Sequence, residues 1–250
     1  MTVKNVRPSH RRRTLVRHVL CGAAAAVVCL GTAIPAAGQA PPARAPAPPP
    51  QKGRLFPPQD LGLIEAPDRA DWQHPDQIMD ALQIADGAVV ADVGAAGGWF
   101  TIQLARRVGP NGLVYAEDIQ PVMIEAVTRR MQQERLSNVR PVLGTVNDPR
   151  LPAPVDAALI VDAYREMEDP VGLLRNLARS LKPQGRLGVV DFNPGGGGPG
   201  PDPSGRVDPE EVVRAAQAAG FRLKSREAVP PFQFLLVFEK APGLPVPRRP

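Results

Sequence analysis

The stretch that decides the fold runs from Val90 to Met123 and reads VADVGAAGGWFTIQLARRVGPNGLVYAEDIQPVM. An apolar run leads into a glycine-rich loop, and a helical pattern follows over Trp99–Val108. The turn Pro110-Asn111-Gly112 then introduces a second strand at Leu113–Asp118. Continuous apolar runs of this length are typical of strands that are buried on both faces. The stretch therefore predicts a strand at Ala88–Val93, then a helix, then a second strand.

The alternation of strand and helix continues on both sides of this stretch. Helices are predicted at Pro75–Ile84, Pro121–Arg135, Pro170–Leu181 and from the Asp208 cap to Gly220, and strands at Val139–Leu143, Val155–Val161, Arg186–Asp191, Phe221–Val229 and Phe232–Glu239. Only Pro230-Pro231 separates the last two strands, so they are expected to pair antiparallel. We predict an α/β fold: a doubly wound, mostly parallel seven-stranded sheet with helices on both faces and a C-terminal antiparallel pair.

The chain before this region has the layout of an export signal and a linker. Residues 4–18 are basic, whereas Val19–Ala37 carries no charge and ends among small residues. This predicts a signal peptide in residues 1–38, resembling the twin-arginine type at Arg12-Arg13, with an uncleaved membrane anchor as the open alternative. Residues 39–58 are then a proline-rich linker, 59–240 the globular domain and 241–250 a disordered tail. We expect an exported or membrane-anchored protein, or a cytoplasmic one if the signal is not used.

Charge and cysteine content exclude several functions for the globular part. Nine of the 30 basic residues and none of the 25 acidic residues lie in residues 1–54, so the remainder holds 21 basic and 25 acidic residues. This balance argues against a nucleic-acid partner, and membrane contact is expected only through the N-terminal segment. Cys21 and Cys29 both precede the globular part, and His74 is its only histidine. Cysteine chemistry and the usual zinc sites are therefore excluded there.

The loop Asp92-Val93-Gly94-Ala95-Ala96-Gly97-Gly98 is the main candidate for ligand binding. Its glycines let the backbone approach a ligand, at the edge of a parallel sheet where ligand crevices lie. The spacing G-x-x-G-G differs from the G-x-G-x-x-G of dinucleotide sites, so a nicotinamide cofactor is not favoured. Asp118 ends the next strand, where its carboxylate can accept hydrogen bonds from both hydroxyl groups of a ribose. Asn147 and Asp148 follow the third strand, where they could meet the edge of an adenine.

Taken together, Val90–Met123 resembles the class I S-adenosylmethionine-dependent methyltransferases. It is most similar to the ubiquinone/menaquinone-biosynthesis type and its uncharacterised bacterial relatives. The segment Leu181-Lys182-Pro183-Gln184-Gly185-Arg186-Leu187 resembles the same family's turn into the fifth strand. The resemblance covers about residues 70–240, and it implies a Rossmann-like methyltransferase fold with S-adenosylmethionine as cofactor.

The resemblance also implies roles for individual residues. The glycine loop would line the methionine half of the cofactor, with Asp92 supporting the loop. Asp118 would hold the ribose, while Asp162 and Ala163 would face the sulfonium. The family has glycine where Ala96 stands, and Gly97 substitutes for it in part. The implied cofactor residues are Asp92, Gly94, Ala95, Gly97, Gly98, Asp118, Ile119, which would pack on the adenine, Asn147 and Asp148, which would contact its amine, and Asp162.

The acceptor side is less defined. Tyr164, two residues after the fourth strand, is the predicted catalytic residue, and a loop aromatic that covers the sheet end is the alternative. The segments Leu55–His74, Ala163–Asp169 and the glycine-rich, mobile loop Asn193–Arg206 would enclose a small, partly apolar acceptor.

Two further alternatives concern metal and catalysis. Oxygen ligands from Asp162, Asp191 and Asn193 could hold Mg²⁺, as in the cation-dependent catechol-type O-methyltransferases. Those enzymes have adjacent Asp and Asn after the fifth strand, whereas Phe192 intervenes here, so we predict no metal. S-adenosylmethionine is made in the cytosol, and an exported enzyme would have to carry it out already bound. The rival function is therefore an exported, non-catalytic binding module that keeps the fold.

Overall fold

The computed structural model of the protein describes residues 55–227 and 231–242. The predicted targeting segment, most of the linker, the end of the predicted strand Phe221–Val229 and most of the tail therefore lie outside the described residues. All described residues belong to one compact unit. Within the described residues, no helix has the length and hydrophobicity that a bilayer crossing requires.

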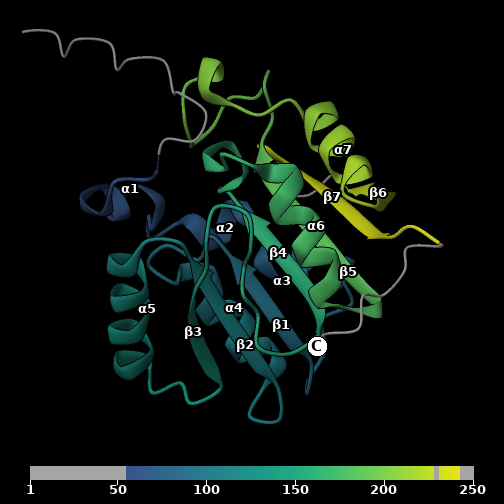
Figure 1. Ribbon diagram of the computed structural model, residues 1–250. Helices are drawn as coiled ribbons and strands as arrows, with labels where there is room; N and C mark the ends of the chain where they lie inside the picture. Colours follow the sequence, from purple (N-terminus) through teal and green to yellow (C-terminus); the bar gives the residue numbers. More distant parts are fainter. Residues whose placement is uncertain (1–54, 228–230, 243–250) are drawn as a thin grey trace, which may run out of the picture. The chain divides into compact units, whose positions relative to one another are not determined.

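One seven-stranded sheet forms the centre of the domain, in the order β3-β2-β1-β4-β5-β7-β6 (Figure 1). Neighbouring strands are parallel except for the pairs β5–β7 and β6–β7, which are antiparallel. This confirms the predicted fold class and the antiparallel C-terminal pair. The strands are β1 (Val89–Val93), β2 (Leu113–Asp118), β3 (Val139–Leu143), β4 (Val155–Val161), β5 (Leu181–Phe192), β6 (Phe221–Glu227) and β7 (Gln233–Lys240).

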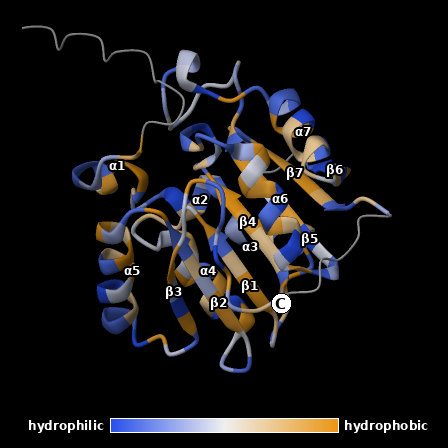
Figure 2. Cartoon of the chain, viewed as in Figure 1, coloured by the Kyte–Doolittle hydropathy of each residue, from blue (hydrophilic) through white to orange (hydrophobic). Residues whose placement is uncertain are grey.

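Helices cover both faces of the sheet. Helices α3 and α4 pack with one set of strand residues and helices α6 and α7 with the other, because successive side chains of a strand point to opposite faces. Figure 2 shows β1 and β4, the strands between these layers, as predominantly apolar. The helices are η1 (Pro58–Asp60), α1 (Leu61–Ile64), α2 (Arg69–Gln73), α3 (Pro75–Ala81), α4 (Trp99–Val108), α5 (Pro121–Glu134), η2 (Tyr164–Glu166), α6 (Pro170–Ser180), η3 (Pro203–Gly205) and α7 (Pro209–Ala218).

The predicted boundaries agree with the structure to within about three residues, except at β5. The start of α7 is fixed by Asp208, whose carboxylate accepts a hydrogen bond from the Glu210 N–H at 3.0 Å. Strand β5 begins at Leu181, five residues before the predicted start. Residues 182–185 read as a turn, but they continue the strand, with a register shift opposite Val155 and Ala157. Such irregularities absorb extra residues without ending the pairing.

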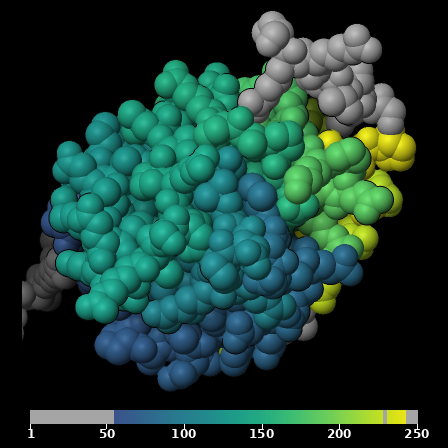
Figure 3. Space-filling model, turned by 90° about the horizontal axis from the view of Figure 1, so that it is seen from below, coloured from purple at the N-terminus to yellow at the C-terminus, as the bar shows by residue number. Residues whose placement is uncertain are grey.

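The loops that follow the parallel strands gather at one end of the sheet. Figure 3 views the domain from below, where residues from the blue and teal parts of the sequence fill most of the visible surface. The loops that follow the carboxyl ends of the parallel strands lie at the opposite end, together with α1 and α2 (Figure 1). Ligand sites of open parallel sheets lie at this end.

Candidate active site

A cavity of about 640 Å³ opens at the carboxyl ends of the parallel strands. This volume falls within the range of roughly 300–1,000 Å³ that is usual for small-molecule sites. Its walls come from the glycine loop after β1, the end of β2, the loops after β4 and β5, and the N-terminal segment that includes α1 and α2. Among its lining residues, nine carry carboxyl groups and only two, Arg69 and Arg165, carry guanidinium groups. The cavity is therefore suited to a ligand with positive charge.

The backbone of the glycine loop is tied to β2. The N–H groups of Gly94 and Ala95 both donate to the carbonyl oxygen of Glu117, at 2.9 and 2.8 Å. Gly94 has φ of 78°, and a Cβ there would lie 2.7 Å from the Cβ of Ala163. Only glycine satisfies both the conformation and the space at this position.

Asp92 lies beneath the loop and is almost fully buried. Its carboxylate accepts a hydrogen bond of 2.6 Å from the hydroxyl of Thr101 in α4. Burial raises the pKa of Asp92 to about 6, and the hydrogen bond from Thr101 opposes that rise. The side chain thus joins the end of β1 to the first turn of α4, which is a supporting position.

Asp118 closes the loop from the other side. Its Oδ2 accepts from the Ala96 N–H at 3.0 Å and its Oδ1 from the Gln120 N–H at 2.9 Å. A carboxylate has about four acceptor positions, so both oxygens can accept further hydrogen bonds from a ligand. Burial raises the pKa of Asp118 above its usual value, and these backbone N–H groups oppose the rise. Ala96 itself has φ of 47°, a left-handed conformation that is uncommon outside glycine.

The structure brings most of the predicted cofactor residues together. The predicted residues that line the cavity are Asp92, Gly94, Ala95, Gly97, Asp118, Ile119 and Asp162. Gly98 is not among them: it has φ of 84° and caps the N-terminus of α4. Asn147 and Asp148 do not line it either, because the chain reverses between Thr145 and Asp148, which pair as an isolated bridge. Thr145 and Val146 line the cavity in their place.

Tyr164 does not occupy the catalytic position that the sequence predicts. Its side chain is 1% exposed and packs in the core with residues of α6 and α7, away from the cavity. Tyr164 begins the short helix η2, and its side chain belongs to the core cluster, whereas Asp162 two residues earlier lines the cavity. Burial raises the pKa of the Tyr164 phenol above its usual value, so the group is a poor proton acceptor at neutral pH.

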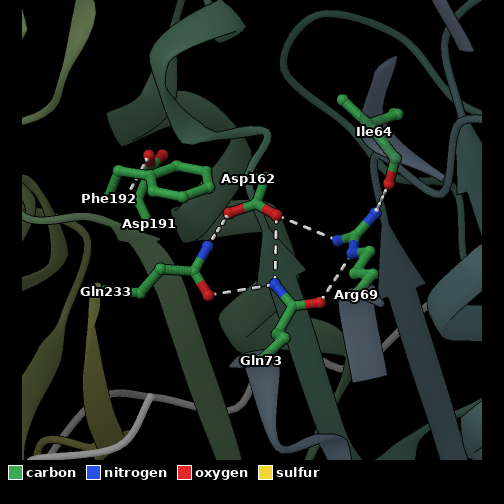
Figure 4. Close-up of polar contacts among 7 residues, drawn as sticks. All are labelled: Ile64, Arg69, Gln73, Asp162, Asp191, Phe192 and Gln233. Atoms are coloured by element: carbon green, nitrogen blue, oxygen red, sulfur yellow. Dashed lines mark hydrogen bonds and ion pairs between the residues drawn. The ribbon is translucent and has the colours of Figure 1, made fainter. Parts of the chain in front are cut away.

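A polar cluster that the sequence did not reveal surrounds Asp162 (Figure 4). Its Oδ2 accepts from Arg69 Nη2 at 2.9 Å and from Gln73 Nε2 at 3.1 Å, and its Oδ1 accepts from Gln233 Nε2. Gln73 also donates to Gln233 at 3.0 Å, and Arg69 donates to the Ile64 carbonyl at 2.5 Å. Arg69 and Asp162 are 93 residues apart in the chain. No local pattern marks such partners, because only the fold brings them together.

Three more carboxyl groups line the cavity and differ in their partners. Glu166 accepts from the Phe56 N–H at 3.1 Å, and burial raises its pKa to about 7. Glu117 is buried with no hydrogen-bond partner for Oε1, and burial raises its pKa. Asp191 is buried with no partner for Oδ2, and burial raises its pKa to about 7. Buried unpaired oxygens are uncommon and often mark functional positions.

The N-terminal segment forms a roof over the cavity. Phe56 is held at both its backbone groups, since Gln120 Nε2 also donates to its carbonyl at 3.1 Å. Glu65 forms an ion pair of 2.6 Å with Arg130 of α5, and a Cβ at Gly97 would clash with its carboxylate. Leu55, Leu63, Ile64 and Trp72 give the roof its apolar surface, whereas Leu61 and His74 do not line the cavity. The segment Leu55–His74, which is predicted to enclose the acceptor, is therefore folded against the glycine loop.

Comparison with known proteins places this arrangement in a family. Residues 90–185 match the family profile described as a methyltransferase domain. A solved structure of a methyltransferase from Aquifex aeolicus, described as dependent on S-adenosylmethionine, superposes with a TM-score of 0.69 and 26% identity, covering 74% of this chain and 98% of the other. The domain belongs to the class I methyltransferases. This confirms the family that the glycine loop and Asp118 indicated.

Relatives among characterised sequences share this domain. The ubiquinone/menaquinone biosynthesis C-methyltransferase UbiE of Pasteurella multocida is 34% identical over 123 residues, which is 46% of this chain and 44% of the relative. The nocamycin O-methyltransferase of Saccharothrix syringae is 30% identical over 129 residues, which is 51% of this chain and 44% of the relative. This chain thus spans less than half the length of these curated relatives.

The residues present fit the cofactor of this family. A Cβ at Gly94 would fill the space beside Ala163, and Asp118 keeps acceptor positions for ribose hydroxyls. The excess of carboxyl groups around the cavity suits a sulfonium cation. Ala96 departs from the family's glycine, but its backbone still reaches the Asp118 carboxylate.

Proposed function

We propose that this methyltransferase domain transfers a methyl group from S-adenosylmethionine to a small, partly apolar acceptor. The observation that carries the proposal is the glycine loop, whose backbone is tied to Glu117 and Asp118 beneath the N-terminal roof. When bound, S-adenosylmethionine supplies an electrophilic methyl group on a positively charged sulfur. The tasks of the protein are then to bind, orient and exclude water.

The two halves of the cavity support a division of these tasks. The half formed by the glycine loop and the end of β2 offers backbone groups and the Asp118 carboxylate, which suit a polar nucleoside and an amino acid. The other half carries Phe56, Trp72, Met167 and Phe192. Such a surface favours an apolar or aromatic acceptor. The names of the relatives, which concern quinones and nocamycin, agree with a small acceptor.

Asp162 connects the two halves. It has φ of 58° and is fixed by its N–H, which donates to the Val190 carbonyl at 2.9 Å. Arg69 and Asp162 form an ion pair of 2.9 Å with both side chains largely buried, so removal of either would leave a buried charge unpaired. We infer that this pair fixes the cavity wall rather than exchanging a proton, because three donors occupy the carboxylate.

The proposal is tested with purified full-length protein and radiolabelled S-adenosylmethionine. Calorimetry should show binding of S-adenosylhomocysteine, and small aromatic acceptors should become labelled in a screen that includes tRNA and protein. Absence of S-adenosylhomocysteine binding would refute the cofactor assignment. Labelling of tRNA or protein alone would refute a small acceptor. Binding without labelling of any acceptor would support the rival function of a non-catalytic module.

We also propose that the chain is exported through its N-terminal segment. The support is the sequence alone: a basic start, the uncharged run Val19–Ala37 and small residues after it. Mass spectrometry of the native protein should find a mature N-terminus near residues 37–41. An intact N-terminus in a cytosolic fraction would overturn export and would place the protein where S-adenosylmethionine is made.

A further inference from the structure

Asp191 is the one buried carboxyl group on the acceptor side of the cavity that lacks a second partner among the described residues. It is the penultimate residue of β5, and its side chain is 1% exposed. Its Oδ1 accepts only from the adjacent Phe192 N–H at 2.8 Å, and Oδ2 has no partner. A buried carboxyl oxygen without a hydrogen bond is unfavourable, so a ligand that donates a hydrogen bond to it gains binding energy.

Three other buried carboxylates of the cavity already accept hydrogen bonds. Asp92 is held by Thr101, Asp118 by two backbone N–H groups, and Asp162 by three side chains. Glu117 also has an unpartnered oxygen, but it faces Gly144 after β3, on the side of the cavity that Asp118 shares. Asp191 alone combines an unpartnered oxygen with a place on the acceptor side.

The surroundings of Asp191 indicate an aromatic ligand. The ring of Phe192 packs against that of Trp72, with centroids 5.9 Å apart at 41°, and both residues line the cavity. The guanidinium of Arg206 lies over the Phe192 ring at 5.5 Å and holds the loop that contributes Pro199, Gly200 and Pro201 to the wall. Aromatic walls favour planar rings through offset or tilted contacts.

We propose that Asp191 is a catalytic residue that binds a hydroxyl group of an aromatic acceptor and takes its proton during methyl transfer. This proposal rests on the proposed function. The acceptor hydroxyl donates its hydrogen bond to Asp191 Oδ2. Its oxygen forms a bond to the methyl carbon as the carbon–sulfur bond breaks, and that electron pair stays on sulfur. The hydroxyl proton passes to Oδ2, so the products are the methyl ether, neutral S-adenosylhomocysteine and a protonated Asp191.

The charges around Asp191 are compatible with this step. Burial and the negative charge of Asp162 raise the pKa of Asp191 to about 7, Glu166 adds to the rise, and Arg165 opposes it. Arg69 balances the charge of Asp162, and Arg206 lies beyond the Phe192 ring. A general base with a pKa near the working pH is charged often enough to accept a proton and basic enough to hold it.

The test compares 1-naphthol with its methyl ether, 1-methoxynaphthalene, which has the same rings but no donor. Calorimetry uses the full-length protein saturated with S-adenosylhomocysteine at pH 5.5 and pH 8.5, so the readout is binding rather than turnover. At pH 8.5 the native protein should bind 1-naphthol at least about tenfold more tightly, because a hydrogen bond to a charged group is among the stronger ones. The preference should fall at pH 5.5, where Asp191 is protonated.

Two variants sharpen the comparison. Asp191→Asn keeps the shape of the side chain and should reduce the preference to less than about threefold at both pH values. Glu134→Gln changes a carboxyl group outside the cavity, one that pairs with Arg106 at 3.0 Å, and should keep the preference. A native protein that binds both naphthalenes equally, or neither, while binding S-adenosylhomocysteine would overturn this proposal alone. Failure to bind S-adenosylhomocysteine would instead contradict the proposed function.

Discussion

Replacement of Asp118 by alanine should weaken both the fold of the glycine loop and the binding of S-adenosylhomocysteine. The side chain is 6% exposed and accepts from two backbone N–H groups, those of Ala96 at 3.0 Å and Gln120 at 2.9 Å. Alanine leaves both donors without their partner. The same substitution removes the acceptor that we assign to the ribose hydroxyls.

The magnitude follows from these contacts. A hydrogen bond to a charged group contributes about 1.5–3 kcal/mol, and an unpaired buried donor costs about 1–3 kcal/mol. Because Ala96 and Gln120 line a cavity that water can enter, the lower end of each range applies. The free energy of unfolding without ligand should therefore fall by about 2–4 kcal/mol. Loss of the contacts to two ribose hydroxyls should weaken S-adenosylhomocysteine binding by a further 1.5–3 kcal/mol or so, which is at least about tenfold.

The assay is urea unfolding with and without S-adenosylhomocysteine. Calorimetry in the absence of urea measures the affinity for S-adenosylhomocysteine. Asp208→Ala is the matched control, since Asp208 also accepts a backbone N–H, that of Glu210 at 3.0 Å, but at the distant start of α7. It should cost about 1 kcal/mol of unfolding free energy and leave binding unchanged. Asp118→Ala with native unfolding and native affinity would refute the reasoning, because it would show that the loop does not depend on this carboxylate.

Ala96→Gly should leave the unfolding free energy unchanged or raise it by up to about 1 kcal/mol, since relief of the left-handed conformation at 47° offsets the added freedom of the unfolded chain; a urea midpoint well below native contradicts this. Asp191→Asn should alter the pH dependence of stability. The folded-state pKa of Asp191 is raised from 3.8 to about 7, so its contribution is fully present below pH 4 and is lost as the pH rises to 7. Relative to the variant, the native protein should lose up to about 4 kcal/mol over this range, and parallel stability curves would exclude the shift. Arg206→Ala should accelerate amide hydrogen exchange in residues 194–206, because the guanidinium donates to the carbonyls of Pro201 at 2.9 Å and Asn193 at 3.0 Å; S-adenosylhomocysteine binding should stay within about threefold. Unchanged exchange would show that the loop is held by other contacts.

The sequence predicts the bounds of those helices and strands whose signals lie in neighbouring residues. The strands β1 and β4 are continuous apolar runs, and α7 has its own start signal at Asp208, so their bounds follow from pattern. Strand β5 begins earlier than predicted because residues 182–185 have the composition of a turn, yet β4 pairs with Leu181 and Arg186 on either side of them. Pairing between segments that are distant in the chain stabilises a strand, and a local sequence pattern does not show this contribution.

The residues of the candidate site also divide into those that neighbouring sequence predicts and those that only the fold brings together. The glycine loop and Asp118 lie within 25 residues of one another, so their spacing could be interpreted directly. Tyr164 and Asp148 follow the strand ends that the sequence predicts, but neither side chain lines the cavity. A short helix begins at Tyr164, and the chain reverses between Thr145 and Asp148. The unpartnered oxygen of Asp191 is visible only in three dimensions.

The Asp162 cluster explains why the roof and the cavity form one unit. Asp162 lies at the end of β4 with its carboxylate buried, a position that is costly for an unpaired charge. Burial raises its pKa, and Arg69 opposes that rise most strongly. Arg69 and Gln73 belong to α2, so their contacts draw α2 over the cavity. Gln233 at the start of β7 completes the cluster. Through Gln233, the antiparallel strand β7 thus helps to fix Asp162 in the cavity wall, and the N-terminal segment is as much a part of that cavity as the glycine loop.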